Sequence, residues 1–147
     1  MSAFVLDCSI TVAWLFDDEA TPETDALLDR LKDGSALVPG LWHLEIANVL
    51  ACAERHKRIS GAQVAAHVNL LGRLPIVTDA ETQSRAFREI LALAGTQRLS
   101  TYDAAYLELA MRRGVALATL DKALVQAARQ VDVESLPADS SHRNSAF

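Results

Sequence analysis

The chain has 147 residues, 50% of them hydrophobic and 22% charged, a size and composition that fit one compact domain. Its formal net charge of −5 argues against a protein that holds nucleic acid by bulk electrostatic attraction. The longest strongly apolar stretch, residues 41–53, falls short of the ~20 residues that a membrane span needs, so we expect no transmembrane helix.

The N-terminus and the cysteines indicate a cytoplasmic protein. Asp7 stands where a signal peptide would still be apolar, so we expect no secretion signal. Cys8 and Cys52 lie in apolar runs, which favour small buried thiols in a reducing compartment over a disulfide.

The first part of the chain alternates short apolar runs with helical patterns. Residues 3–6 predict a buried strand, and a helix is expected from about Ser9. Residues 21–32 begin with Thr-Pro-Glu, typical of an N-cap and first helical turn, and residues 36–38 predict a second strand. Residues 41–58 have helical spacing and almost no polar face, which predicts a central, buried helix.

The second part of the chain continues the alternation. Further helices are expected at residues 60–73, 80–94, 101–113 and 121–130. Further strands are expected at residues 74–77, 115–120 and 131–136. Ser60 and Ser100 are predicted N-caps, and Gly114 is predicted to end a helix.

This order of elements predicts the fold class. Strands that alternate with helices imply right-handed crossovers and a mostly parallel sheet covered on both faces. We therefore expect an α/β protein, a three-layer α/β/α sandwich, over residues 1–136. Residues 137–147 are polar and rich in serine, so we expect a disordered tail there.

Four acidic residues are candidates for a shared site. Ligands of open α/β sheets bind beyond the C-terminal ends of the strands. Asp7 and Asp121 each follow a predicted strand directly, and Asp103 lies in the first turn of a helix. Glu45 lies within the most apolar helix, where a lone charge is costly unless it is paired or bound to a cation.

Each of these residues also has a purely structural interpretation. Asp7 and Asp121 fit ordinary helix caps, and Asp103 fits the distal partner of a capping box begun by Ser100. Glu45 fits a half-exposed position on a helix that is less buried than predicted. One shared site explains the four together better than four separate accidents do.

The expected chemistry is hard-cation binding. Carboxylate oxygens suit Mg²⁺ or Mn²⁺, and the sequence has no cluster of cysteine and histidine typical of Zn²⁺. Ser9, Asn48 and Thr119 are spaced to hydrogen-bond a carboxylate or a bound water, and equally to act as local helix or turn caps.

Four segments in this order resemble the PIN-domain family, specifically the VapC-type toxins of prokaryotic toxin–antitoxin pairs. The segments are F-V-L-D-C-S, H-L-E-I-A-N-V-L, L-S-T-Y-D-A-A-Y-L-E-L-A and V-A-L-A-T-L-D-K-A-L. The resemblance implies a Mg²⁺- or Mn²⁺-dependent endoribonuclease whose acidic site is formed by Asp7, Glu45, Asp103 and Asp121. It also implies a homodimer, a cognate antitoxin as partner, and an RNA substrate such as tRNA or another structured RNA.

An acidic site repels the RNA backbone, so basic side chains are expected to guide the substrate. The candidates are Arg55, Lys57 and Arg58, or Arg112 and Arg113, and solvated helix ends are the alternative interpretation of both clusters.

Other functions fit the sequence less well. A haloacid-dehalogenase-type phosphatase needs a second aspartate where this chain has Ser9, and a P-loop or dinucleotide fold needs glycines after the first strand. The remaining alternative is a metal-stabilised module that binds RNA or protein without cutting it. An RNA cleavage assay with and without Mg²⁺ or Mn²⁺ separates the two.

Overall fold

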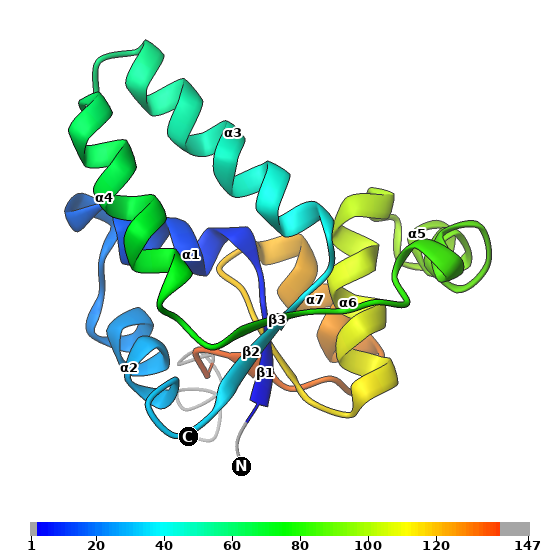
Figure 1. The fold of residues 1–147 in the computed structure, drawn as a ribbon. Coiled ribbons are helices and arrows are strands. Elements are labelled where there is room, and N and C mark those ends of the chain that lie inside the picture. Colours follow the sequence, from blue (N-terminus) through cyan, green and yellow to red (C-terminus); the bar gives the residue numbers. More distant parts are fainter. Residues whose placement is uncertain (1–2, 139–147) are drawn as a thin grey trace.

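The computed structural model describes residues 3–138. One sheet runs through the molecule in the order β3-β2-β1-β4-β5, and every pair of neighbouring strands is parallel (Figure 1). The strands are β1 (Ala3–Leu6), β2 (Ser35–Val38), β3 (Ile76–Thr78), β4 (Ala116–Ala118) and β5 (Ser135–Leu136). The helices are α1 (Cys8–Leu15), α2 (Pro22–Arg30), α3 (Leu41–Arg55), α4 (Gly61–Gly72), α5 (Leu91–Gln97), α6 (Thr101–Arg113) and α7 (Lys122–Gln130).

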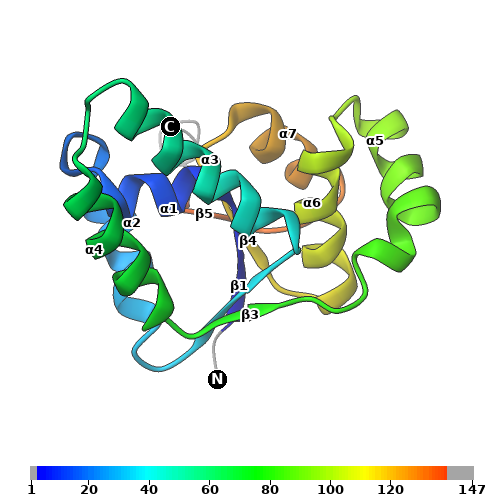
Figure 2. The same cartoon turned by 45° about the horizontal axis from the view of Figure 1, so that its top comes forward.

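The helices form two layers on opposite faces of the sheet. In both views α1 to α4 lie on one side of the strands and α5 to α7 on the other (Figures 1 and 2). Right-handed crossovers require this arrangement, because the chain moves from β1 towards β3 and then returns past β1 to β4 and β5. The three-layer α/β/α prediction is confirmed.

The strand order reverses at β1, which pairs with β2 on one side and β4 on the other. Beyond the ends of these strands, the backbone N–H of Asp7 donates to the carbonyl of Ala118 at 3.0 Å. The C-terminal ends of β1 and β4 therefore form the switch point of the sheet, where open α/β folds place their ligand sites.

The most buried helix is α6. The helix predicted at residues 41–58 is present as α3, but the prediction that it is central and buried is wrong. Residues 104–110 of α6 are all buried, because α6 packs on β1 and β4 and is covered by α5 and α7. In contrast, α3 buries only a stripe spaced at three or four residues, and its Leu44 is 76% exposed. The stripe consists of Trp42, Ile46, Leu50 and Ala53.

Two predicted elements differ from the structure in detail. The helix expected at 80–94 begins as a 3₁₀ turn (Gln83–Arg85) and a π turn (Ala86–Ile90), and only then becomes α5. The strand expected at 131–136 is paired only at Ser135–Leu136, because Asp132 has a positive φ of 59° and the chain turns there.

The tail prediction for residues 137–147 lies outside the described residues apart from Pro137 and Ala138. Within residues 3–138, no helix combines the length and the apolar character needed to cross a membrane.

Candidate active site

Asp7 is a buried carboxylate at the switch point. Its side chain follows β1, is 6% exposed, and its Oδ2 accepts hydrogen bonds from Ser9 Oγ and Thr119 Oγ1, both at 2.7 Å. Each hydroxyl oxygen also accepts from the loop after β4, Ser9 from the N–H of Leu120 at 2.9 Å and Thr119 from that of Asp121 at 3.0 Å. Ser9 and Thr119 therefore orient Asp7 and join the ends of β1 and β4.

Glu45 lies half-buried on α3, on the layer opposite α6. Its Oε1 accepts a short hydrogen bond from the hydroxyl of Tyr106, which lies fully buried on α6. Burial raises the pKa of Tyr106 far above its usual value, so the hydroxyl keeps its proton and acts as the donor. Sequence reasoning missed Tyr106, although its spacing of three residues from Asp103 puts both on one helix face.

Asp103 and Asp121 lie at the N-termini of α6 and α7. The backbone N–H of Asp103 donates to Ser100 Oγ at 3.1 Å, so Ser100 is the predicted N-cap. Asp121 caps α7, because its Oδ1 accepts from the N–H groups of Ala123 and Leu124. Asp121 is therefore the N-cap of α7, and it also lies close enough to Asp103 for the two charges to interact.

The structure places the four carboxylates close enough for their charges to act on Glu45 and Asp103. Burial raises the pKa of Asp103, and the charges of Asp121 and Asp7 raise it further. Burial also raises the pKa of Glu45, outweighing the hydrogen bond from Tyr106, and the charges of Asp7 and Asp103 add to the increase.

Cys8 is a neutral bystander at this site. Burial, followed by the charges of Glu45 and Asp7, raises the pKa of its thiol to about 12. Because a nucleophilic cysteine must be a thiolate, this environment excludes Cys8 as a nucleophile near neutral pH.

Asn48 makes no hydrogen bond to the four carboxylates among the described residues. Asn48 is exposed, and its amide oxygen lies 3.9 Å from the Cys52 thiol, one turn further along α3.

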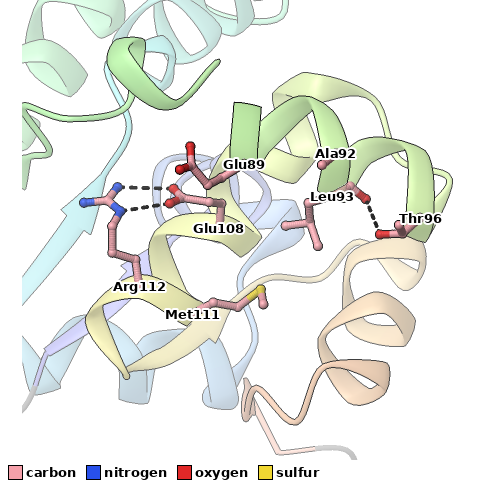
Figure 3. Close-up of a pocket in the computed structure, with 7 residues that line it drawn as sticks. All are labelled: Glu89, Ala92, Leu93, Thr96, Glu108, Met111 and Arg112. Carbon is pink, nitrogen blue, oxygen red and sulfur yellow. Dashed lines mark hydrogen bonds and ion pairs between the residues drawn. The ribbon is translucent and has the colours of Figure 1, made fainter. Parts of the chain in front are cut away.

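Two of the predicted RNA-guiding arginines are occupied by internal ion pairs. Arg58 contacts Asp18 at 2.9 Å and lies over the ring of Phe16. Arg112 is largely buried and pairs with Asp79 at 2.6 Å and with Glu108 at 2.9 Å; Figure 3 shows the Glu108 pair beside a pocket of about 480 Å³ between α5 and α6. Arg112 is therefore held inside the protein by its ion pairs, whereas the Arg58 pair lies at the surface.

A family model for the PIN domain matches residues 4–130. The chain belongs to the PIN domain family. No curated protein has a matching sequence. Proteins with PIN domains are generally nucleases, so nuclease activity is supported at the level of the family.

Solved structures share the fold of this PIN domain. PAE2754 from Pyrobaculum aerophilum is 21% identical, with a TM-score of 0.66 over 92% of this chain and 84% of that one. VapBC2 from Rickettsia felis, bound to a DNA fragment from its promoter, is 14% identical, with a TM-score of 0.65 over 90% of this chain and 96% of that one. FitAcB from Neisseria gonorrhoeae is 18% identical, with a TM-score of 0.64 over 95% of this chain and 99% of that one.

PIN domains generally use divalent metal ions, and the donor atoms here fit such an ion. The candidate ligands are all carboxylate oxygens, which Mg²⁺ and Mn²⁺ prefer, and a cation relieves their mutual repulsion. Within residues 3–138, however, no three acidic, histidine or cysteine side chains already close on a common metal position.

We predict that, in chelator, Asp103→Asn raises the Tm of the protein by roughly 2–4 °C, equivalent to about 1 kcal/mol. The substitution removes a charge that burial and two neighbouring carboxylates disfavour, and it keeps the backbone bond to Ser100. Thermal melts are compared with Asp25→Asn, an exposed aspartate in the first turn of α2, which is expected to lower the Tm slightly through the helix dipole. Millimolar Mn²⁺ is expected to stabilise the wild type, and to stabilise the Asp103→Asn variant far less.

The same melts in chelator carry a pH dependence. A carboxyl whose pKa is raised by folding binds more protons in the folded state, so stability increases as the pH falls from 7 through that raised pKa. Asp79, whose pKa Arg112 lowers to about 2, stays ionised above pH 5 and does not interfere with this measurement.

The Asp103→Asn prediction is contradicted if the variant is less stable than the wild type in chelator and responds equally to Mn²⁺. That result supports the interpretation of Asp103 as a helix cap only.

Proposed function

We propose that this PIN domain is a Mg²⁺- or Mn²⁺-dependent endoribonuclease that acts in the cytoplasm as the toxin of a type II toxin–antitoxin pair. The observation that carries the proposal is the group of four carboxylates at the switch point: buried Asp7 at the end of β1, Asp121 after β4, and Glu45 and Asp103 within range of their charges. A purely structural set of helix caps does not need to be concentrated where the sheet reverses, and its repulsion destabilises the fold.

The roles of the acidic residues follow from their surroundings. Asp7 and Asp103 are the main proposed metal ligands, with Glu45 and Asp121 completing the set. When bound, the cation activates water and stabilises the negative charge of the phosphodiester transition state. Ser9 and Thr119 hold the Asp7 carboxylate in one orientation through two hydroxyl donors.

The proposed reaction uses no histidine. His43, two residues from Glu45, lies with its ring nitrogens near Gly40 O and Thr78 Oγ1, at 3.4 and 3.5 Å. Attack by water in line with the leaving oxygen leaves 5′-phosphate and 3′-hydroxyl ends. The RNA expected from the family resemblance is tRNA or another structured RNA.

We predict that Asp7→Asn and Asp103→Asn each lower RNA cleavage by about 100-fold or more, because each loses a metal-ligand charge and little volume. Cleavage of total cellular RNA with Mg²⁺, with Mn²⁺ and with chelator measures the effect, and end-labelling identifies the termini. Asp25→Asn is the matched control and is expected to cleave like the wild type. Binding of RNA without metal-dependent cleavage by the wild type supports the non-catalytic alternative instead.

An antitoxin is the proposed protein partner. The similar structures VapBC2 and FitAcB are antitoxin–toxin complexes, which supports the same kind of partner here. The acidic site favours a basic side chain from the antitoxin. An arginine or lysine among the carboxylates takes the place of the metal ion and also blocks the position of the RNA phosphate.

We therefore expect the antitoxin encoded beside this chain to inhibit cleavage through an arginine or lysine in its toxin-binding segment. Alanine substitution of the basic residues in that segment is expected to restore cleavage, measured with the complex at saturating antitoxin. Inhibition that survives removal of every one of them contradicts the idea.

A homodimer is also proposed, and an exposed apolar patch supports it. Leu44, Phe87, Leu91 and Tyr102 are 76%, 91%, 53% and 65% exposed, and they line one groove of about 830 Å³. Among residues 3–138, the only charged residue that lines this groove is Asp79, which is paired with Arg112. A largely apolar patch suits pairing with an identical copy of an acidic chain, because self-association there brings few like charges together.

We predict that Phe87→Lys converts the dimer into a monomer at micromolar concentration, measured by light scattering without antitoxin. Each subunit then contributes one lysine, so the substitution places two positive charges in an apolar interface. Val68→Lys, at a 54% exposed position on α4 outside the patch, is the control and is expected to leave the dimer intact. A monomeric wild type counts against the homodimer.

A further inference from the structure

Tyr106 connects the two helical layers at the site. Its side chain is fully buried on α6, yet its hydroxyl reaches Glu45 Oε1 on α3 and donates a hydrogen bond to it. A buried hydroxyl without a partner is costly, so this residue type at this position requires an acceptor. A phenylalanine fills the same volume without that requirement.

The hydrogen bond is specific to Glu45. Among residues 3–138 it is the only hydrogen bond or ion pair of the Glu45 side chain, whereas Asp7 is held by Ser9 and Thr119. Two members of the acidic cluster are therefore held separately. The hydroxyls of Ser9 and Thr119 hold Asp7, and the phenol of Tyr106 holds Glu45.

The placement of Tyr106 relates it to a second carboxylate as well. Asp103 and Tyr106 are three residues apart on α6 and lie on one face of that helix. The helix that carries Asp103 is therefore also the helix that holds the Glu45 side chain.

We propose that Tyr106 is a positioning residue, whose hydroxyl fixes the Glu45 carboxylate in the orientation with which Glu45 joins the cation-binding group. The inference rests on the proposed function, since it concerns the same acidic site. Residues that orient a metal ligand typically change metal affinity or activity by about 10- to 100-fold when they are replaced.

Calorimetric titration of Mn²⁺ into the full chain, without RNA, tests the inference. Tyr106→Phe removes only the hydroxyl and is expected to weaken Mn²⁺ binding about 10-fold or more. Asp25→Asn, at an exposed position on α2 outside the site, is the control and is expected to change binding by no more than about twofold.

A double-mutant cycle separates positioning from general structural damage. In a Glu45→Gln background, Tyr106→Phe is expected to cause no further loss of Mn²⁺ affinity, because the hydroxyl acts only through the Glu45 carboxylate. A further loss as large as that in the wild-type background overturns the inference. A Tyr106→Phe variant that does not fold also overturns the inference, because a hydroxyl that acts only through Glu45 can be removed while the ring keeps its packing in the core.

The outcomes distinguish this inference from the proposed function. A wild type that binds Mn²⁺ and a folded Tyr106→Phe variant that binds it equally well overturn the inference alone. A wild type that binds neither Mn²⁺ nor Mg²⁺ overturns the proposed function, and the positioning role with it.

Discussion

The buried carboxylate of Asp7 connects the strand order to the chemistry of the site. An ionised carboxylate with 6% exposure costs several kcal/mol unless hydrogen bonds replace its lost water. Here Ser9 and Thr119, from chain segments more than 100 residues apart, both donate to the same oxygen. The ends of β1 and β4 must therefore stay together for Asp7 to be tolerated, and this requirement fixes the edge of the sheet to which the other carboxylates are delivered.

Those other carboxylates come from both helical layers. Glu45 belongs to α3 on one face of the sheet, and Asp103 belongs to α6 on the other (Figures 1 and 2). The Tyr106 hydrogen bond crosses between these layers. Bringing like charges together opposes folding, and the burial of α6 in the core, over residues 104–110, offsets that cost. The architecture thus maintains a cluster that the carboxylates themselves disfavour.

Local patterns in the sequence predicted most of the fold. Apolar runs and caps such as Ser60 and Ser100 located the main elements, and their alternation predicted the parallel sheet. The errors arose where burial depends on neighbours rather than on composition. The helix at Leu41–Arg55 is apolar nearly all round but is covered on one side only, whereas α6, with its glutamate and arginines, is enclosed by the sheet, α5 and α7.

The sequence by itself determined which acidic residues were candidates, because Asp7 and Asp121 directly follow apolar runs and Glu45 interrupts one. Only the tertiary structure decided that these carboxylates lie within range of one another's charges and that Tyr106 donates a hydrogen bond to Glu45. It also decided that Arg58 and Arg112 are used in internal ion pairs. The physical reason is that periodicity reports the face on which a side chain lies, while charge interactions depend on distances between segments that the chain brings together only when it folds.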